Sequence, residues 1–432
     1  MTTPARALAL SALLRFEGAG QYANLTLSTA LEREGSALSP ADRALFTALF
    51  YSVIEHKITL DAVIDSLSSL PPSAIEAQVR MILRLALAQL LYFDRIPDSA
   101  AVNEAVSAAP RRSAGFVNAL LRQFLRNQKA VPLPDEGKDP VGYLSVRFSV
   151  TRELAALFLT RFGASRTRSL LEAFEKKPEI TVRVNTQKLS RETFLARVPG
   201  SRPTANAPYG VILPAGADLS ALLSEGICFV QDEASQIAVA ALEAGTARRA
   251  ADLCAAPGSK SFGIAMDMKE GSVYSADLHE NKLSLIRAGA ARLGLANIEV
   301  HTGDARRARE EIDGTFDRVL CDVPCSGLGV LAKKPDLRYK DLSGIGGLLP
   351  VQSDILRAGA ALTAPGGFLL YSTCTLLPEE NEEQVTAFLA GNSDFSLSPF
   401  RVGGIECGGM YTLAPDREGT DGFFVARLRK RD

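Results

Sequence analysis

The chain is poor in the residues that build metal sites and disulfide frameworks. Its 432 residues include no tryptophan, three histidines and six cysteines. The histidines do not stand at the spacing of metal ligands, so no metal is expected. Six cysteines in so long a chain are too few for the disulfide framework of a small secreted protein. We therefore expect a cytoplasmic protein with reduced thiols, one or two of which are chemically active.

The sequence also lacks an excess of charge and a long apolar run. Its 48 Lys and Arg residues against 49 Asp and Glu residues leave a net charge of −1, which excludes a globally basic nucleic-acid binder but not a local cationic face. No stretch approaches the ~20 apolar residues of a membrane span. The apolar residues 7–14 fit an amphipathic helix better than a signal peptide. A hydrophobic content of 47% excludes wholesale disorder.

The pattern along the chain predicts a multidomain protein. Residues 1–128 carry apolar side chains at helical spacing and predict an all-α bundle. Residues 129–142 are rich in proline and mixed charge, as linkers are. Residues 143–225 mix both kinds of element and predict a small α+β subdomain. The elements expected there are helices at 150–162 and 165–176 and strands at 180–184 and 209–213.

Residues 226–432 show short apolar strands alternating with helices, which predicts an α/β Rossmann-like domain with a largely parallel sheet. The expected strands are 250–253, 272–276, 298–301, 316–321 and 367–371, and the expected helices are 259–268, 280–293, 350–362 and 378–390. Ligands of such sheets bind at the carboxyl ends of the strands. The residues that follow these strands are therefore the candidates for a site.

A turn of small residues follows the first of these strands. Small side chains let a ligand approach the backbone, and the next helix N-terminus offers N–H groups. The glycine spacing is that of neither a P-loop nor a dinucleotide-binding loop. The turn comprises Cys254, Ala255, Ala256, Pro257, Gly258, Ser259 and Lys260.

Carboxylates stand at the ends of the next three strands. Asp277, about 20 residues after the turn, is placed to accept both hydroxyls of a ribose. Asp304 is placed to meet an adenine amino group, and Asp322 ends the fourth strand. A single acid at such a position often only caps a helix. The set of three favours a ligand with ribose and adenine but no phosphate, namely S-adenosylmethionine.

Two cysteines follow strands at the same edge. Cys325 lies in Pro-Cys-Ser-Gly, shortly after Asp322, and Cys374 lies in Ser-Thr-Cys-Thr. One thiolate can add to carbon 6 of a pyrimidine, which makes carbon 5 nucleophilic toward an activated methyl group. The second thiol could assist removal of the carbon-5 proton and release of the enzyme. Asp322 could hydrogen-bond the amino group and ring nitrogen of the base and stabilise the adduct. The cysteines that fit small buried side chains are Cys228, Cys254, Cys321 and Cys407.

Taken together, these motifs resemble the RNA cytosine-5 methyltransferases over about residues 180–426. The segments that carry the resemblance are Arg183-Val184-Asn185-Thr186, Asp-Leu-Cys-Ala-Ala-Pro-Gly, Asp-Val-Pro-Cys-Ser-Gly-Leu-Gly, Lys334-Pro335-Asp336, Tyr-Ser-Thr-Cys-Thr and Asp421-Gly422-Phe423-Phe424. The chain departs from the family pattern at Ser259, where a second glycine is usual, and at Tyr339, where a tryptophan is common.

The resemblance implies a role for each candidate residue. In that family the cysteine of the Thr-Cys motif is the nucleophile, which implies Cys374. The cysteine of the Pro-Cys motif aids product release, which implies Cys325. The turn 254–260, with the three aspartates at the strand ends, is implied as the S-adenosylmethionine site.

The N-terminal part resembles the NusB-like RNA-binding fold, on residues 95–106 and 116–122. A NusB-like domain fused to this catalytic module is similar to bacterial methyltransferases of small-subunit (16S) ribosomal RNA. The resemblance implies methylation of carbon 5 of one cytosine in that RNA, and we expect a monomer. The target base must leave its stack to reach a thiol, so an unpaired cytosine is the expected substrate.

Clustered basic residues fit contacts with RNA phosphates. They fall into three segments, with Arg111, Arg112, Arg122, Arg126 and Lys129 in the first, Arg147, Arg152, Arg161, Arg166 and Arg168 in the second, and Arg427, Arg429, Lys430 and Arg431 in the third. Three other functions stay open. They are a NusB-type RNA-binding or antitermination factor, a methyltransferase acting on another RNA such as tRNA, and a DNA cytosine methyltransferase that uses the Pro-Cys thiol.

Overall fold

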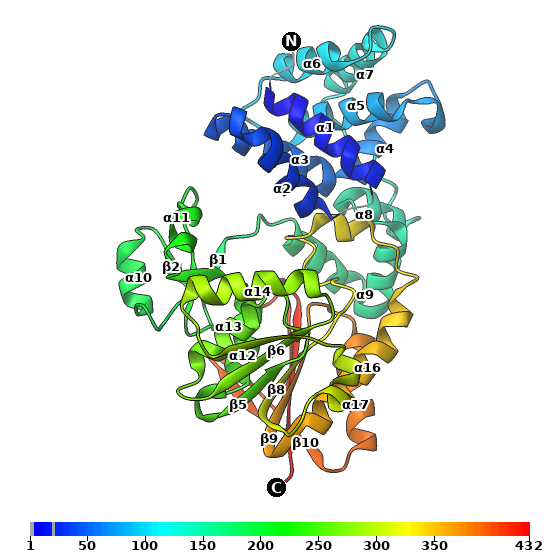
Figure 1. Ribbon diagram of the computed structural model, residues 1–432. Coiled ribbons are helices and arrows are strands. Elements are labelled where there is room, and N and C mark those ends of the chain that lie inside the picture. The colour runs from blue at the N-terminus through cyan, green and yellow to red at the C-terminus, as the bar shows by residue number, and fades with distance from the viewer. Residues whose placement is uncertain (1–3, 20–21) are drawn as a thin grey trace. The chain divides into compact units, whose positions relative to one another are not determined.

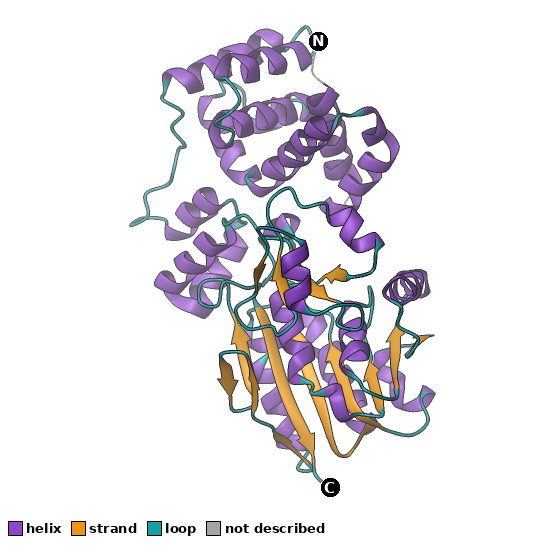
Figure 2. Ribbon diagram, turned by 90° about the vertical axis from the view of Figure 1, so that its left-hand side faces the viewer, coloured by secondary structure: helices purple, strands orange, loops and turns teal. Residues whose placement is uncertain are grey.

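The computed structural model describes residues 4–19 and 22–432, apart from the side chains of residues 19 and 36. The chain divides into two compact units, whose elements are shown in Figure 1 and Figure 2. Unit 1 comprises Met1–Glu175 and Leu331–Asp341, and unit 2 comprises Lys176–Val330 and Leu342–Asp432.

Unit 1 is helical, as the sequence predicts for residues 1–128. Its helices are α1 (Pro4–Ala19), α2 (Ala23–Glu34), α3 (Pro40–Glu55), α4 (Lys57–Leu67), α5 (Ala77–Tyr92), α6 (Asp98–Ala108), α7 (Ala114–Arg126), α8 (Pro140–Phe148) and α9 (Arg152–Phe174), and short 3-10 turns stand at Gly35–Ala37, Pro72–Ala74 and Pro335–Tyr339. One apolar stripe of α7 is buried, and α5 is buried on almost every side. The predicted bundle is confirmed, and residues 7–14 lie within α1.

Helices α8 and α9 pack in unit 1, whereas the predicted boundaries at 142 and 225 group them with the middle subdomain. The Oγ1 atom of Thr59 in α4 donates a hydrogen bond to the carbonyl of Val146 in α8 at 2.6 Å. Gly163 interrupts the helical backbone of α9 with φ 74° and ψ 168°, so the two predicted helices appear as its two halves. Helix α8 was not predicted; it begins at Pro140 and is capped by Asp139, whose side chain accepts from the Gly142 N–H.

Unit 2 holds a small antiparallel sheet and a large mixed sheet. The small sheet has the order β2-β3-β1-β4, with β1 (Thr181–Val184), β2 (Arg202–Pro203), β3 (Gly210–Ile212) and β4 (Cys228–Val230). The large sheet has the order β10-β14-β9-β8-β5-β6-β7, and β13 pairs with β14. Its strands are β5 (Arg249–Asp252), β6 (Ser272–Asp277), β7 (Ile298–Thr302), β8 (Phe316–Asp322), β9 (Thr363–Thr373), β10 (Phe395–Leu397), β13 (Met410–Leu413) and β14 (Phe423–Lys430). Strands β5 to β9 run parallel, as predicted, and β14 pairs antiparallel with β9.

Helices cover both faces of the large sheet. Successive residues of a strand point to opposite faces, so neighbouring residues of one strand belong to different cores. Ala250 and Leu320 belong to the core under α12 (Glu233–Ala241), α13 (Ser259–Asp267) and α14 (Glu280–Leu293), whereas Ala251 and Val319 belong to the core under α15 (Ala308–Glu311) and α16 (Ile345–Leu362). The remaining elements of this unit are α10 (Arg191–Arg197), α11 (Leu219–Ser224), α17 (Glu382–Gly391), the hairpin β11 (Phe400–Val402) and β12 (Ile405–Cys407), and 3-10 turns at Ala244–Thr246, Ala305–Arg307 and Pro378–Glu380. This is the predicted Rossmann-like architecture.

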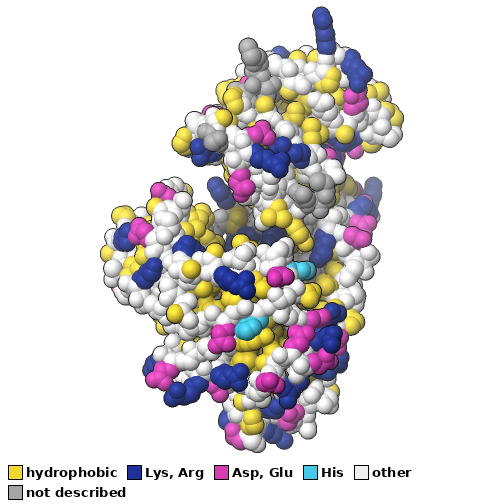
Figure 3. Space-filling model, viewed as in Figure 1, with side chains coloured by type: hydrophobic (Ala, Val, Ile, Leu, Met, Phe, Trp, Pro, Cys, Tyr) yellow, Lys and Arg dark blue, Asp and Glu magenta, His cyan; other side chains and the backbone are white. Residues whose placement is uncertain are grey.

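Many of the basic residues singled out in the sequence are neutralised by acidic neighbours. Arg427 is only 4% exposed and lies 2.5 Å from the Glu243 carboxylate, so it belongs to the core. The prediction that Arg427 contacts RNA phosphates is therefore wrong. Figure 3 shows basic and acidic side chains interspersed over the visible surface. Further pairs join Arg112 to Glu76, Lys129 to Asp98, Arg147 to Glu175, Arg152 to Asp139 and Arg168 to Glu136.

Within the described residues, no helix combines the length and apolar character needed to cross a membrane.

Candidate active site

The candidate site lies where the strand order of the large sheet reverses. Strands β6 and β7 follow β5 on one side of it, and β8 and β9, which come later in the chain, lie on the other side of β5 (Figure 1). The carboxyl ends of β5, β6 and β8 therefore meet at one edge, where ligands of such sheets bind. The register places Asp322, the last residue of β8, directly opposite Ser372 of β9.

The two predicted cysteines are brought together. The Sγ atoms of Cys325 and Cys374 lie 3.3 Å apart, and the backbone N–H of Cys374 donates to the Cys325 sulfur, also at 3.3 Å. A disulfide bond is about 2.05 Å long, so these are two separate thiols. The hydrogen bond with Cys374, together with burial, raises the pKa of Cys325 well above its usual range. The two predicted thiols are therefore within hydrogen-bond distance of each other.

Buried polar groups tie the two cysteine loops to each other. The Glu380 carboxylate is fully buried and accepts from the Ser326 N–H at 2.8 Å. It also accepts from the Gln352 side chain at 2.9 Å, and Gln352 donates to the Pro324 carbonyl at 3.0 Å. The hydroxyls of Ser326 and Thr375 lie 2.8 Å apart. Glu380 and Gln352 were not predicted as part of the site. For Glu380 the available signal was an acid in the Pro-Glu-Glu-Asn run just after the Thr-Cys motif.

Two glycines allow the backbones of three loops to touch. The Gly329 N–H donates to the Cys374 carbonyl at 3.0 Å, and the Gly422 N–H donates to the Gly329 carbonyl at 2.8 Å. A Cβ atom on Gly329 would stand 2.0 Å from the Gly422 carbonyl oxygen. This contact explains why glycines occur in both the Pro-Cys-Ser-Gly-Leu-Gly and the Asp-Gly-Phe-Phe segments.

Asp322 is held by two polar side chains. Its Oδ2 atom lies 2.7 Å from the Lys260 ammonium, and its Oδ1 atom accepts from the Ser372 hydroxyl at 2.7 Å. Burial lowers the pKa of Lys260, but the ion pair with Asp322 more than offsets this, so its pKa is raised. Lys260 therefore keeps its charge, and its Nζ lies 5.3 Å from the centre of the Phe423 ring. The structure connects the predicted cofactor turn with the predicted catalytic aspartate through Lys260.

The turn 254–260 lies against Asp277, as expected of a cofactor loop. The Ala256 N–H donates to the Asp277 Oδ2 atom at 3.1 Å, and the His279 N–H donates to its Oδ1 atom at 3.0 Å. Gly258 has φ +109°, and a Cβ atom there would lie 2.5 Å from Cζ of Phe262. Burial raises the pKa of the Cys254 thiol well above its usual range, consistent with an inert thiol.

The Asp304 carboxylate forms an ion pair with the neighbouring Arg306. Arg306 pairs with its carboxylate at 2.5 Å, and the Arg306 N–H donates to it at 3.0 Å. The hydrogen bond from Arg306 lowers the pKa of Asp304. The Gly303 N–H donates to the Asp277 carbonyl at 3.2 Å, which brings the segment beside Asp277. An adenine amino group would have to share this carboxylate with Arg306.

Asp252, at the end of β5, was not predicted as part of the site. Burial raises its pKa to about 7. Its Oδ2 atom accepts from the Ser261 hydroxyl at 2.7 Å, whereas its buried Oδ1 atom has no hydrogen-bond partner. An unsatisfied buried acceptor beside a turn of small residues fits a bound ligand that carries donor groups. S-adenosylmethionine has such groups in its methionine ammonium and its ribose hydroxyls.

Among residues 4–19 and 22–432, no group of three or more His, Cys, Asp or Glu side chains is arranged to hold a metal ion.

Replacing Gly258 with alanine should damage the turn. The backbone conformation is one that residues with a Cβ adopt at a cost of about 1–3 kcal/mol, and the new methyl group would collide with Phe262. We expect a lower melting temperature and at least tenfold weaker binding of S-adenosylhomocysteine, measured by calorimetry. Gly245→Ala is the control, since its nearest neighbour is an ordinary 3.6 Å away. Equal ligand affinity in both variants would show that the turn does not hold the cofactor.

Comparisons with known proteins place the chain in a family. The family described as 16S rRNA methyltransferase RsmB/F matches residues 239–429, and the NusB family matches residues 3–126. The chain is 36% identical over 448 residues to the "Probable ribosomal RNA small subunit methyltransferase B" of Bacillus subtilis, with 99% of each chain covered. A protein of the same name from Synechocystis is 34% identical over 450 residues, again with 99% of each chain covered. The crystal structure of PH0851 aligns over 100% of both chains with a TM-score of 0.80 and 26% identity. The chain therefore belongs to the 16S rRNA methyltransferase RsmB/F family, with a NusB-family domain preceding its methyltransferase domain.

Proposed function

We propose that this protein transfers a methyl group from S-adenosylmethionine to carbon 5 of an unpaired cytosine in 16S ribosomal RNA, through a covalent cysteine–cytosine adduct. The observation that carries the proposal is the 3.3 Å separation of the Cys325 and Cys374 sulfurs beside Asp322. The names of the relatives and the NusB-family domain support ribosomal RNA as the substrate. The protein acts in the cytoplasm and as a monomer.

Cys374 acts as the nucleophile. Its thiolate forms a bond to carbon 6 of the cytosine, and the electron pair of the carbon 5–carbon 6 double bond makes carbon 5 nucleophilic. Bound S-adenosylmethionine supplies the sulfonium methyl group that carbon 5 takes up. Loss of the carbon-5 proton then restores the double bond and expels the Cys374 thiolate, which frees the methylated base.

Cys325 assists the release of the enzyme. Its raised pKa keeps the thiol protonated, so the carbon-5 proton passes to water, and the Cys325 S–H group can hydrogen-bond the Cys374 thiolate as that sulfur leaves carbon 6. The loop contacts made by Glu380 and Gln352 hold this thiol beside the reacting centre. Asp322 accepts hydrogen bonds from the amino group and ring nitrogen of the adduct, and Lys260 and Ser372 orient its two oxygens.

The experiment that tests the proposal maps methyl groups by bisulfite sequencing. The purified protein is incubated with S-adenosylmethionine and, in parallel, with naked 16S rRNA, small ribosomal subunits, tRNA and duplex DNA. We expect one protected cytosine, in 16S rRNA or the small subunit. Methylation of tRNA or DNA alone would overturn the choice of substrate. RNA binding without methyl transfer to any substrate would instead favour the RNA-binding or antitermination factor.

A further inference from the structure

One segment of the methyltransferase sequence folds into the helical unit. Residues 331–341 follow the Cys325 loop directly and precede α16, yet they pack in unit 1, whereas residues up to 330 and from 342 onward belong to unit 2. The segment contains Lys334-Pro335-Asp336 and Tyr339. The chain that leaves the Cys325 loop is therefore anchored in another folded unit before it returns to α16.

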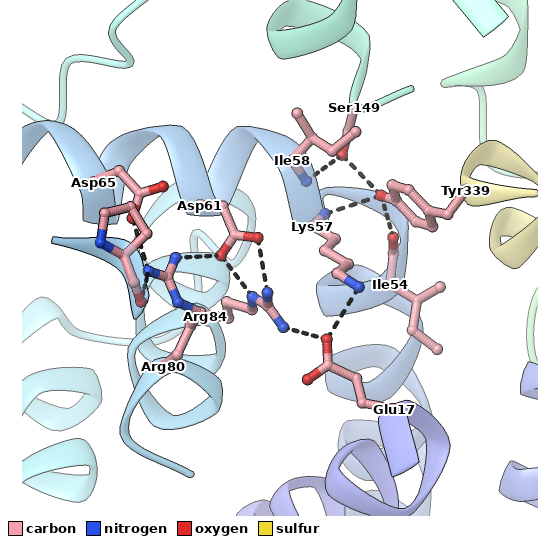
Figure 4. Close-up of polar contacts among 11 residues, drawn as sticks. Glu17, Ile54, Lys57, Ile58, Asp61, Asp65, Arg80, Arg84, Ser149 and Tyr339 are labelled. Atoms are coloured by element: carbon pink, nitrogen blue, oxygen red, sulfur yellow. Dashed lines mark hydrogen bonds and ion pairs between the residues drawn. The ribbon is translucent and has the colours of Figure 1, made fainter. Parts of the chain in front are cut away.

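The hydroxyl of Tyr339 is fully hydrogen-bonded inside unit 1 (Figure 4). It donates to the Ile54 carbonyl at 2.6 Å and accepts from the Lys57 N–H at 3.1 Å. The Ser149 hydroxyl lies 2.8 Å away and itself accepts from the Ile58 N–H at 2.9 Å. Because the Tyr339 hydroxyl donates its one proton to the Ile54 carbonyl, the Ser149 hydroxyl must be the donor in the hydrogen bond between Ser149 and Tyr339. Each of these hydroxyl and N–H groups then has a partner. Burial raises the pKa of Tyr339 to about 12, so the hydroxyl keeps its proton.

Arg338 makes a second anchor. It is 4% exposed and donates to the Phe148 carbonyl at 2.8 Å and to the Phe174 carbonyl at 3.0 Å. These carbonyls belong to the last residues of α8 and α9, where carbonyl groups lack helical partners and a cation is favoured. The Thr151 N–H returns a bond to the Arg338 carbonyl at 3.1 Å. Arg338 thus ties the segment to two helices at once.

The receiving surface is rigid. The groups that hold Tyr339 include backbone atoms at the junction of α3 and α4, and an ion network surrounds that junction (Figure 4). Glu17 pairs with Lys57 at 3.1 Å and with Arg84 at 2.5 Å. Arg84 also donates two hydrogen bonds of 2.7 Å to Asp61. Bidentate, partly buried pairs of this kind hold fixed geometry.

We propose that Tyr339 and Arg338 are positioning residues for methyl transfer. They hold residues 331–341, which continue directly from the loop that carries Cys325, and so restrict the conformations open to the C-terminal end of that loop. The other end of that loop is fixed by Asp322 and its partners in the large sheet. This inference rests on the proposed function.

The test compares Tyr339→Phe with Thr59→Val in the full-length protein. The first variant removes the hydroxyl that anchors the segment. The second removes one buried hydroxyl bond between α4 and α8, in the same region but outside residues 331–341. For each variant we would measure kcat and KM for RNA, binding of S-adenosylhomocysteine, and hydrogen exchange by mass spectrometry. The wild-type protein run alongside shows whether the methyl transfer proposed above occurs at all.

We expect kcat of Tyr339→Phe to fall about tenfold, with KM for RNA and cofactor affinity unchanged, because the loss of a buried hydrogen-bond partner has a cost of that order. Its residues 323–341 should exchange faster than in the wild type, and those of Thr59→Val should not. Unchanged kcat and exchange in Tyr339→Phe, or a change in KM alone, would overturn the inference. If the wild type is inactive on every RNA, the proposed function fails, and the exchange data still decide whether Tyr339 holds the loop.

Discussion

Cys374→Ala is expected to lose all detectable methyl transfer and to form no covalent complex with RNA. The reason is that the carbon 6 adduct requires a thiolate at the position of Cys374, and burial still raises the pKa of the neighbouring Cys325 thiol in this variant, so Cys325 does not replace it. Cys325→Ala should also turn over poorly, but for the opposite reason. Its adduct forms and is methylated, and then resolves slowly, so protein accumulates on the RNA.

Both variants can be followed by transfer of a radioactive methyl group and by a denaturing gel that retains covalent complexes. Cys407→Ala is the control, because Cys407 lies in the hairpin β11–β12 and makes none of the contacts of the site. It should turn over like the wild type. A covalent complex in Cys374→Ala and none in Cys325→Ala would exchange the two roles, as in the DNA-type alternative.

Asp322→Asn is expected to lower kcat by 10²–10³-fold, the usual effect of removing one stabilising group for a developing charge. The change also leaves the buried Lys260 ammonium without its carboxylate partner. Breaking a buried pair in this way typically destabilises a protein by about 3–5 kcal/mol. Activity must therefore be measured well below the melting temperature.

The double variant Lys260→Met/Asp322→Asn separates the two effects. It removes the unpaired charge, so most of the stability should return while the activity stays low. If the activity of the double variant recovers together with its stability, the role of Asp322 is structural and not catalytic.

The same ion pair predicts opposite pH dependences of stability. In the wild type the pKa of Lys260 is raised by folding, so the contribution of the pair is complete at lower pH and is lost as the pH rises through that pKa. In Asp322→Asn burial, which lowers the pKa of Lys260, is the largest remaining influence, opposed by the charges of Asp252 and Cys374. The stability of that variant should therefore rise with pH as the lysine loses its proton. Chemical denaturation between pH 7 and pH 10 measures the difference: in the wild type this range lies below the raised pKa of Lys260, so the pair contributes fully throughout, whereas the stability of the variant should rise.

Local patterns in the sequence predicted the elements with strong periodicity. The apolar stripe of α7 and the buried strands β5, β6, β8 and β9 are cases in which the spacing of side chains alone reports the buried face. Strands β10 and β13 were missed because they are short and pair with β14, so their structure depends on a distant partner. Helix α8 was missed because it lies between a proline-rich stretch and a short turn.

The residues of the candidate site also divide into those that the sequence predicted and those that it did not. Cys325, Cys374, Asp322 and the turn 254–260 carry motifs, and all were named from the sequence. Glu380 and Gln352 act through contacts with the backbone of another loop; the acidic run after the Thr-Cys motif marks Glu380 as a candidate but does not show which loop it contacts. The anchoring of Tyr339 was likewise beyond the sequence, because its partners Ile54 and Ser149 stand far from it along the chain.

The most direct test uses RNA in which the target cytosine is replaced by 5-fluorocytosine. Fluorine cannot leave carbon 5 as a proton does, so the wild-type adduct cannot resolve. Digestion of the trapped complex with trypsin and nuclease, followed by mass spectrometry, identifies the sulfur bound to the base. A methylated fluorocytosine on the peptide that contains Cys374 is the result predicted here. Attachment to Cys325, or methylation with no trapped complex, would contradict it.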